Sequence, residues 1–292
     1  MARSSGTAAV ARRERRRERL RLVFGAVTSR VINLELHCHT VASLDGMMSY
    51  QSLLRTARAV GIDALAITDH DTIAGALEVR ELVRRSETPL EVIIGEERTL
   101  SDGSHLIGLF LERPIKSNDL QEVIREIEGQ GGVCLIPHPF RRKDGLFRGG
   151  LAPLEFFQER VGGFELFSAK CSYAENQRAA ELLAGSRLGP FAGSDAHYEC
   201  DLGESINEVE WQGDLRSSLV GMLKRDVACR LLGKRQQAAD GERTYAPLYY
   251  RMRPYARVPR FLLPAAKEAY RSYRNWKFGI GRKELHEVYR HA

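Results

Sequence analysis

Short apolar runs alternate with amphipathic stretches from residue 31 onward, and this alternation constrains the fold more than any other feature of the chain. We predict seven strands, at residues 34–39, 64–68, 90–96, 104–111, 132–137, 163–167 and 190–192. Apolar residues at helical spacing predict helices at residues 49–60, 72–85, 118–130, 173–184, 215–225 and 265–276. Strands that alternate with helices pair in parallel and carry the helices outside. Seven such strands favour a closed α/β barrel over an open sheet.

The charge of the chain is unevenly distributed. The 292 residues carry a net charge of +6. Residues 1–30 hold nine arginines and two glutamates, a net charge of +7, and residues 230–292 hold 15 lysines and arginines against five acids, a net charge of +10. Residues 31–229 therefore carry −11. We predict a basic N-terminal extension at 1–30, an acidic barrel at 31–232, and a basic tail rich in Tyr, Arg and Pro at 233–292.

The composition excludes several other classes of protein. With 43% hydrophobic and 28% charged residues, the chain is typical of folded proteins. No apolar run approaches the roughly 20 residues of a membrane-spanning helix, and no apolar segment of a secretory signal follows the N-terminal arginines. The five cysteines form no CxxC pair, so we expect reduced thiols and a cytoplasmic protein. Neither a GxGxxG sequence nor a P-loop occurs, which removes the commonest nucleotide-binding sheets.

Histidines and acids gather where the predicted strands end or begin. In a parallel barrel, the carboxyl ends of the strands form the rim that carries the active site. His37 and His39 are two residues apart at the end of the first strand, so their side chains share one face while Cys38 faces the other. The remaining candidates near strand ends and in the first loop are Asp45, Asp69, His70, Asp71, Glu96, Glu97, His105, His138, Asp195 and His197.

Imidazoles and carboxylates without cysteine are typical ligands of hydrolytic Zn, Mn or Fe sites. A lone buried histidine is more often an ordinary core residue, and an isolated HxH sequence is weak evidence. Here, however, many independent candidates fall on one predicted rim. Bound cations would also account for the excess negative charge of the barrel. The sequence therefore predicts a metal centre.

The segments ELHCHTVASLDG, ITDHDT, GEE, HLIGLF, IPHP and GSDAH occur in this order. As an ordered set they resemble the polymerase-and-histidinol-phosphatase (PHP) domain family of metal-dependent phosphoesterases, over about residues 33–230. The resemblance implies a distorted (β/α)7 barrel, similar to a TIM barrel. It also implies two or three divalent ions, Mn, Zn or Fe, at the carboxyl rim.

Carried over to this sequence, the ligand positions of the family fall into three sets. These sets are His37, His39, Glu97 and Asp195 for one ion; Glu97, His105 and His138 for a second; and Asp45, His70 and His197 for a third. The family spacing from Gly95 favours Glu97 over Glu96, and only one of two neighbouring strand residues can point inward. Asp69 is expected to orient a ligand or to hydrogen-bond behind the ligands.

Such a centre implies a hydrolase that cleaves a phosphate ester by attack of a metal-bound hydroxide, on a small phosphomonoester or a nucleotide. Arg141, Arg142 and Lys143 follow His138 and could clamp the substrate phosphate, or they could form a solvated charged turn. The alternative function is a non-catalytic metal-binding barrel that serves as a nucleic-acid-binding or regulatory module. The complete set of nine candidate ligands argues against this alternative.

The basic ends allow three interpretations. Arginines interleaved with tyrosines could bind nucleic acid. Trp276, Phe278 and Ile280 could instead contact an anionic membrane surface. The tail could also pack on the barrel or form an oligomer contact, an interpretation favoured by the prolines of the tail and by the apolar residues 261–263.

Overall fold

The computed structural model describes residues 30–86, 88–149, 154–236 and 263–292. The predicted N-terminal extension therefore lies almost entirely outside the described residues, as does much of the predicted tail, including residues 237–262. The described strands are β1 (Val31–Cys38), β2 (Ala64–Ile67), β3 (Glu91–Thr99), β4 (His105–Leu109), β5 (Val133–Ile136), β6 (Gly163–Ser168), β7 (Gly189–Gly193), β8 (Ser205–Glu210), β9 (Cys229–Lys234) and β10 (Leu285–His291). They form one sheet in the order β10-β9-β8-β1-β2-β3-β4-β5-β6-β7.

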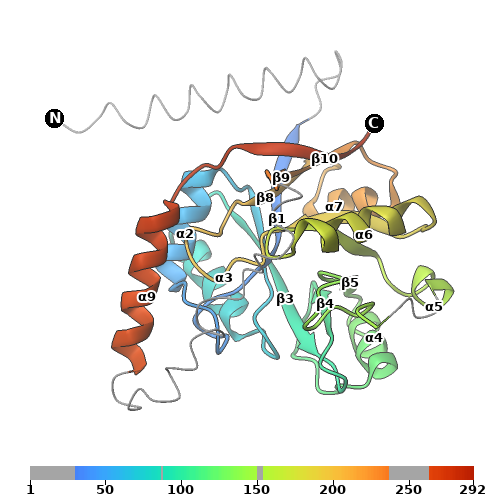
Figure 1. Cartoon of the computed structure of the whole chain (residues 1–292), viewed down its shortest axis with the longest axis horizontal. Coiled ribbons are helices and arrows are strands. Elements are labelled where there is room, and N and C mark those ends of the chain that lie inside the picture. The colour runs from blue at the N-terminus through green and yellow to red at the C-terminus, as the bar shows by residue number, and fades with distance from the viewer. Residues whose placement is uncertain (1–29, 87, 150–153, 237–262) are drawn as a thin grey trace.

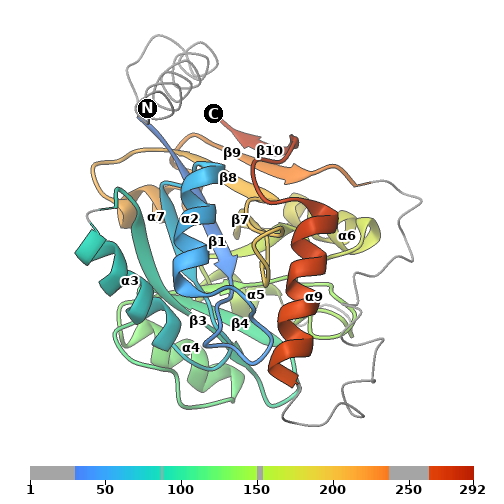
Figure 2. The ribbon, with the colours of Figure 1, turned by 90° about the vertical axis from the view of Figure 1, so that its left-hand side faces the viewer.

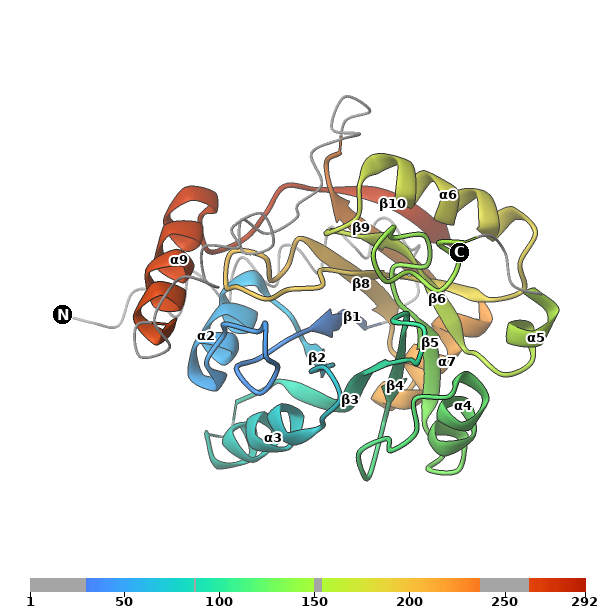
Figure 3. The same cartoon turned by 60° about the horizontal axis from the view of Figure 1, so that its bottom comes forward.

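The sheet is curled, and helices lie around its outside (Figures 1 and 3). The described helices are α2 (Tyr50–Val60), α3 (Ala74–Ser86), α4 (Leu120–Glu128), α5 (Leu154–Gln158), α6 (Tyr173–Ala184), α7 (Leu215–Lys224) and α9 (Leu263–Phe278). Six of them agree with the predicted helices to within two residues at either end, and α5 was not predicted. Local sequence explains the boundaries: the Ser49 hydroxyl accepts from Ser52 N at the start of α2, and Gly61 ends that helix with φ 83°.

The seven predicted strands are present as β1–β7, but their pairing is mixed. The β1–β2, β2–β3, β5–β6 and β6–β7 pairs are parallel, whereas β4 is antiparallel to both β3 and β5. Residues 100–104 alone connect β3 to β4, and a parallel crossover needs about a dozen residues or more. The strands β8, β9 and β10 add antiparallel pairs that were not predicted. The fold is thus a mixed α/β curled sheet, not the simple alternation that the sequence pattern suggested.

The carboxyl ends of β1 and β7 meet across the curl. His39 N donates to Ala196 O at 2.8 Å, and Ala196 N donates to His37 O at 3.3 Å. Cys38 and Ala196 form an isolated parallel bridge. This closure brings the HxH segment after β1 next to the SDAH segment after β7, although the two lie more than 150 residues apart in sequence.

Alternation along β1 separates the apolar core from the polar interior. Leu34 and Leu36 belong to the hydrophobic core, as does Cys38, whose thiol donates to Ala66 O. Glu35 and His37 are equally buried but lie among polar side chains inside the curl. The first strand therefore carries core residues on one face and site residues on the other.

Part of the predicted tail belongs to the same sheet. β10 pairs antiparallel with β9, and the predicted boundary between residues 232 and 233 falls inside β9. Figure 2 shows α9 on the side of the molecule near the loop after β1, where Lys267 Nζ donates to Leu44 O at 3.2 Å. Within the described ranges, none of the helices is both long and apolar enough to cross a membrane.

Candidate metal centre

Six imidazole rings form one continuous cluster at the ends of the strands. Neighbouring ring centroids lie between 4.3 and 5.6 Å apart. The members are His37, His39, His70, His105, His138 and His197. They come from the ends of β1, β2, β5 and β7 and from the start of β4. The sequence prediction that these histidines share one rim is therefore matched by their positions.

Glu97 lies at the middle of the cluster and is completely buried. Its Oε2 atom lies 3.2 Å from His37 Nε2, 3.2 Å from His39 Nε2 and 3.5 Å from His70 Nε2. Its Oε1 atom lies 2.9 Å from His105 Nδ1 and 2.8 Å from His138 Nε2. One carboxylate thus faces five imidazoles and separates them into two groups, one at each oxygen.

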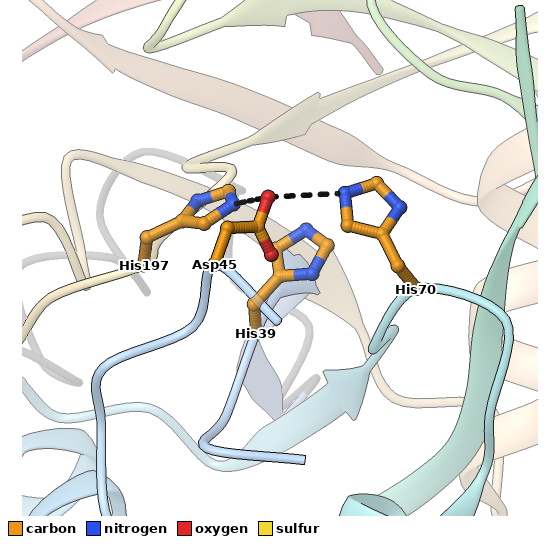
Figure 4. Close-up of side chains that lie close together, drawn as sticks. All are labelled: His39, Asp45, His70 and His197. Carbon is orange, nitrogen blue, oxygen red and sulfur yellow. Dashed lines mark ion pairs between the residues drawn. The ribbon is translucent and has the colours of Figure 1, made fainter. Parts of the chain in front are cut away.

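All nine candidate ligands lie in groups whose donor atoms are within 4.8 Å of one another. The groups are His37, His39, Glu97 and Asp195; His39, Asp45, His70 and His197; His70, Glu97 and His105; and His105, His138 and Asp144. In the second group, Asp45 Oδ2 lies 3.2 Å from His197 Nε2 and 3.5 Å from His70 Nε2 (Figure 4). The grouping differs from the expected sets in three respects. His39 joins the group of Asp45, His70 takes the place of His138 beside Glu97 and His105, and Asp144 joins His105 and His138.

Buried polar atoms test whether this cluster suits metal ions. Neither ring nitrogen of His39 has a hydrogen-bond partner among the described residues, although both are buried. Yet His39 Nε2 lies 3.2 Å from a carboxylate oxygen of Glu97 and 3.2 Å from one of Asp195. A buried nitrogen without a partner is costly, and a divalent ion between these atoms would satisfy all three side chains. The donor set therefore fits a metal ion such as Zn, Mn or Fe.

Electrostatics lead to the same conclusion. Burial raises the pKa of Glu97 and of Asp195, but His37 and its neighbours, together with Arg141 beside Asp195, hold both pKa values well below their usual range. Burial likewise lowers the pKa of His37, yet the charges of Glu97, Asp195 and Glu165 raise it well above its usual value. Ionised carboxylates at this site thus depend on nearby positive charge, which a divalent cation supplies.

Two of the candidate ligands have strained backbones. His138 has φ 28° and Asp195 has φ 47°, in the region that non-glycine residues rarely adopt. His138 N donates to Glu165 Oε2 at 2.6 Å, and the chain after Asp195 is bridged to β1 through Ala196. Such conformations cost about 1–3 kcal/mol each and concentrate at functional sites.

Glu165 and Asp144 are site residues that the sequence patterns did not single out. Glu165, in β6, is completely buried, and its Oε1 lies 3.2 Å from His37 Nδ1. Asp144 accepts from Arg141 Nε and lies 3.6 Å from His138 Nδ1. Carboxylates behind the ligating imidazoles orient the rings and increase their basicity. A single acid inside the apolar strand GFELFS was the signal that could have identified Glu165.

Asp69 lies behind the cluster, where its carboxylate hydrogen-bonds to the turn that follows His39. Its two carboxylate oxygens accept from Thr40 N at 2.6 Å and from Thr40 Oγ1 at 2.7 Å. Gly75 packs directly on this contact, because a Cβ atom there would lie 2.0 Å from Asp69 Oδ2. Asp69 is thus placed to orient His39 through the backbone, in line with its expected supporting role.

Glu96 lies on the opposite face of β3 from Glu97. It is completely buried, and its Oε2 accepts from Ile115 N at 3.0 Å. Burial raises the pKa of Glu96 to about 7 from an ordinary value of 4.5, although the Ile115 hydrogen bond and Arg98 oppose the shift. The ionised form is therefore disfavoured in the folded protein.

We expect Glu96→Gln to stabilise the protein in a pH-dependent manner. Because the folded pKa is raised, wild type loses stability as pH rises from about 4.5 through 7. The glutamine removes this penalty and its carbonyl still accepts from Ile115 N. The free energy of unfolding in urea should increase by up to about 3 kcal/mol at pH 8 and change little at pH 4. An equal change at both pH values would contradict the ionisation argument.

The three cations after His138 have different positions. Arg141 reaches the cluster: its guanidinium donates to Asp195 and lies 3.0 Å from His138 Nε2. Arg142 and Lys143 are exposed, and Lys143 Nζ lies 3.7 Å from Asp144 Oδ2. Arg141 is therefore the member of the three whose side chain lies directly beside the candidate ligands.

Two family models match the sequence. The model described as PHP domain matches residues 35–138, and the model described as PHP-associated matches residues 174–226. The first segment holds seven of the nine candidate ligands, and the second holds Asp195 and His197. The structure brings the two segments together at one cluster.

Curated relatives match part of the chain. An uncharacterised protein of Methanocaldococcus jannaschii is 37% identical over 117 residues, which are 36% of this chain and 67% of that protein. A 5'-3' exoribonuclease of Haemophilus influenzae is 39% identical over 82 residues. These residues make up 27% of this chain and 29% of the enzyme. The match thus spans less than a third of the exoribonuclease.

Solved structures share the fold at lower identity. A two-domain protein of Bacteroides vulgatus, described as containing a predicted PHP-like metal-dependent phosphoesterase, has a TM-score of 0.58 at 20% identity, over 69% of this chain and 65% of that one. A lesion-specific endonuclease of Pyrococcus furiosus has a TM-score of 0.54 at 14% identity, over 67% of this chain and 56% of that one. The fold shared with these structures agrees with a PHP-like barrel. From both matched segments, and from the cluster in which they meet, we conclude that the chain belongs to the PHP domain family.

Proposed function

We propose that this protein hydrolyses phosphate esters, and that its substrate is a small phosphomonoester or a nucleotide. The observation that carries this proposal is the position of Glu97, whose two oxygens face separate groups of imidazoles. A carboxylate shared between adjacent sites is suited to hold two ions side by side, as in two-metal hydrolases. When bound, such ions lower the pKa of a water molecule towards neutrality and neutralise charge on phosphate oxygens.

The side chains of the protein would then serve three purposes. Glu97 and Asp195 compensate the positive charge of the site and set the spacing of its groups. Glu165 orients the ring of His37 through Nδ1, which leaves Nε2 directed at the cluster. Arg141, which donates to Asp195, is close enough to the cluster to contact a phosphate oxygen with a second N–H group.

A phosphodiester at the end of a nucleic acid is a second candidate substrate. The Haemophilus influenzae relative, which is 39% identical to this chain over 82 residues, is a 5'-3' exoribonuclease. The two substrate classes require the same chemistry at phosphorus. They differ in what surrounds the metal centre, because an oligonucleotide needs a surface for the rest of its strand.

Metal content and hydrolysis test this proposal together. We expect elemental analysis of the purified protein to find two or three divalent ions per chain. A panel of phosphorylated metabolites and short oligonucleotides should reveal hydrolysis with Mn²⁺ that excess chelator abolishes. His37→Ala should remove both metal and activity. If the protein binds no divalent ion and His37→Ala has no effect, the enzymatic proposal is wrong; if it binds metal and nucleic acid but hydrolyses nothing, a non-catalytic module is favoured.

A further inference from the structure

The helix α9 carries a row of aromatic rings outside both segments matched by the family models. The ring centroids of Tyr270 and Tyr273 lie 6.4 Å apart, and those of Tyr273 and Trp276 lie 6.2 Å apart. Their spacing of three residues places them on neighbouring positions of the helix surface. At its inner end the row continues to Tyr198, whose centroid is 5.9 Å from that of Tyr270. Tyr198 directly follows His197, so the row begins next in sequence to a candidate ligand of the group His39, Asp45, His70 and His197.

Exposure increases along this row. Tyr198 is 6% exposed, Tyr273 is 44% exposed and Trp276 is 81% exposed. A tryptophan so open to solvent contributes little to the stability of the fold. Ring faces in solvent, in a row with the buried ring of Tyr198, provide a surface on which flat groups can stack.

Positive charge accompanies the row. Residues 267–283 contain six lysines and arginines and one acid. Lys277 Nζ lies 5.6 Å from the centroid of Tyr273 and 5.3 Å from that of Phe278, and it pairs with no carboxylate of the described residues. Lys267 reaches the loop after β1, where its Nζ donates to Leu44 O next to Asp45. Cations therefore lie both beside the rings and near the metal centre.

A buried ion pair and a hydrogen bond hold α9 to the loop that carries Asp195 and His197. Arg274 donates to Asp201 Oδ1 at 2.7 Å, and Asn275 Nδ2 donates to Glu199 Oε2 at 2.7 Å. Glu199 and Asp201 are both buried. The row of rings thus has a fixed position relative to the metal centre, which a binding surface for a substrate requires.

We propose that the aromatic row of α9 binds single-stranded nucleic acid, with bases stacked on Tyr273 and Trp276 and the phosphate backbone directed towards the metal centre. Aromatic stacking combined with cations that follow the backbone is the general mode of single-strand binding. A membrane surface would use Trp276 but would leave unexplained the continuity of the row to Tyr198 beside His197. Delivery of a phosphate group of the nucleic acid to the ions rests on the proposed function, whereas binding of the nucleic acid by α9 does not.

The chain contains two tryptophans, so the tryptophan fluorescence of the full-length Trp211→Phe variant comes from Trp276 alone. In excess chelator, which prevents cleavage, a titration with an oligouridylate of about 12 nucleotides should quench the emission of Trp276. Fluorescence anisotropy of a labelled oligouridylate should show that Tyr273→Ala/Trp276→Ala weakens binding tenfold or more. Tyr273→Phe/Trp276→Phe should retain most of the affinity. Leu77→Ala, which truncates a side chain 39% exposed on α3, serves as the control and should bind as wild type does.

Two results would overturn the proposal. One is equal oligouridylate affinity in the double alanine variant and wild type. The other is a blue shift of Trp276 emission with phosphatidylserine vesicles and no response to the oligonucleotide, which would assign the row to a membrane surface. Hydrolysis of p-nitrophenyl phosphate with Mn²⁺ separates this proposal from the proposed function. The Tyr273→Ala/Trp276→Ala variant should hydrolyse this small substrate at the wild-type rate. If neither wild type nor any variant hydrolyses a substrate while oligouridylate still binds through α9, the stacking surface stands and the enzymatic proposal fails.

Discussion

Glu97→Gln should lower the rate of phosphate-ester hydrolysis by at least ~1000-fold, which corresponds to about 4 kcal/mol of activation free energy. Both oxygens of Glu97 face the imidazoles, so an uncharged side chain weakens two adjacent ion sites at once. The amide nitrogen also places a donor where a metal ion needs an acceptor. Initial rates at saturating Mn²⁺, together with metal content per chain, measure the effect.

Glu96→Gln is the matched control for this variant. It makes the same chemical change one residue earlier on β3, but on the face where the side chain accepts from Ile115 N. We expect it to retain metal and activity while it gains stability at alkaline pH. If Glu96→Gln reduced activity as much as Glu97→Gln, the assignment of Glu97 as the inward residue would be contradicted.

Glu165→Gln should have the second largest effect, a loss of about 10- to 100-fold in metal affinity. The two oxygens of Glu165 serve two donors, because Oε1 faces His37 Nδ1 and Oε2 accepts from His138 N at 2.6 Å. Glutamine has one oxygen, so its amide group must face one of these N–H groups and repel it. The ring of His37 or the backbone at His138 then moves, and the ligand geometry loosens.

Isothermal titration calorimetry of the metal-free protein with Mn²⁺ measures the metal affinity of wild type and of Glu165→Gln. Glu208→Gln is a suitable comparison, since Glu208 is also buried on a strand but accepts from Arg230. This second variant should lose stability without losing metal affinity. Equal metal affinity in wild type and Glu165→Gln would show that the carboxylate has no role in orienting the ligands.

Local sequence was sufficient to locate most of the elements. The boundaries of α2 and α6 follow from side-chain caps at Ser49 and Ser172, which act within three or four residues. The candidate ligands could be found because parallel strands place their carboxyl ends at one rim. His37, His70 and His138 therefore pointed to a common site before any contact between them was known.

Other features depended on partners far away in sequence. The antiparallel direction of β4 follows from a short connection, but the strands β8 and β10 are polar sequences whose pairing depends on β1 and β9. Asp144 and Glu165 matched no ligand spacing, and their roles come from contacts with His138 and His37. The row from Tyr198 to Trp276 joins segments that are 72 residues apart at their closest point along the chain.

The sequence by itself thus determined the positions of most strands and helices, the candidate residues of the metal centre and the family resemblance. These properties are encoded in short periodic patterns, because side-chain direction repeats along a strand or helix. The tertiary structure decided which oxygen of Glu97 faces which imidazole, which carboxylates support the ligands, and where α9 lies relative to the site. These depend on how the sheet curls and closes between β1 and β7, a property of long-range packing that no local pattern specifies.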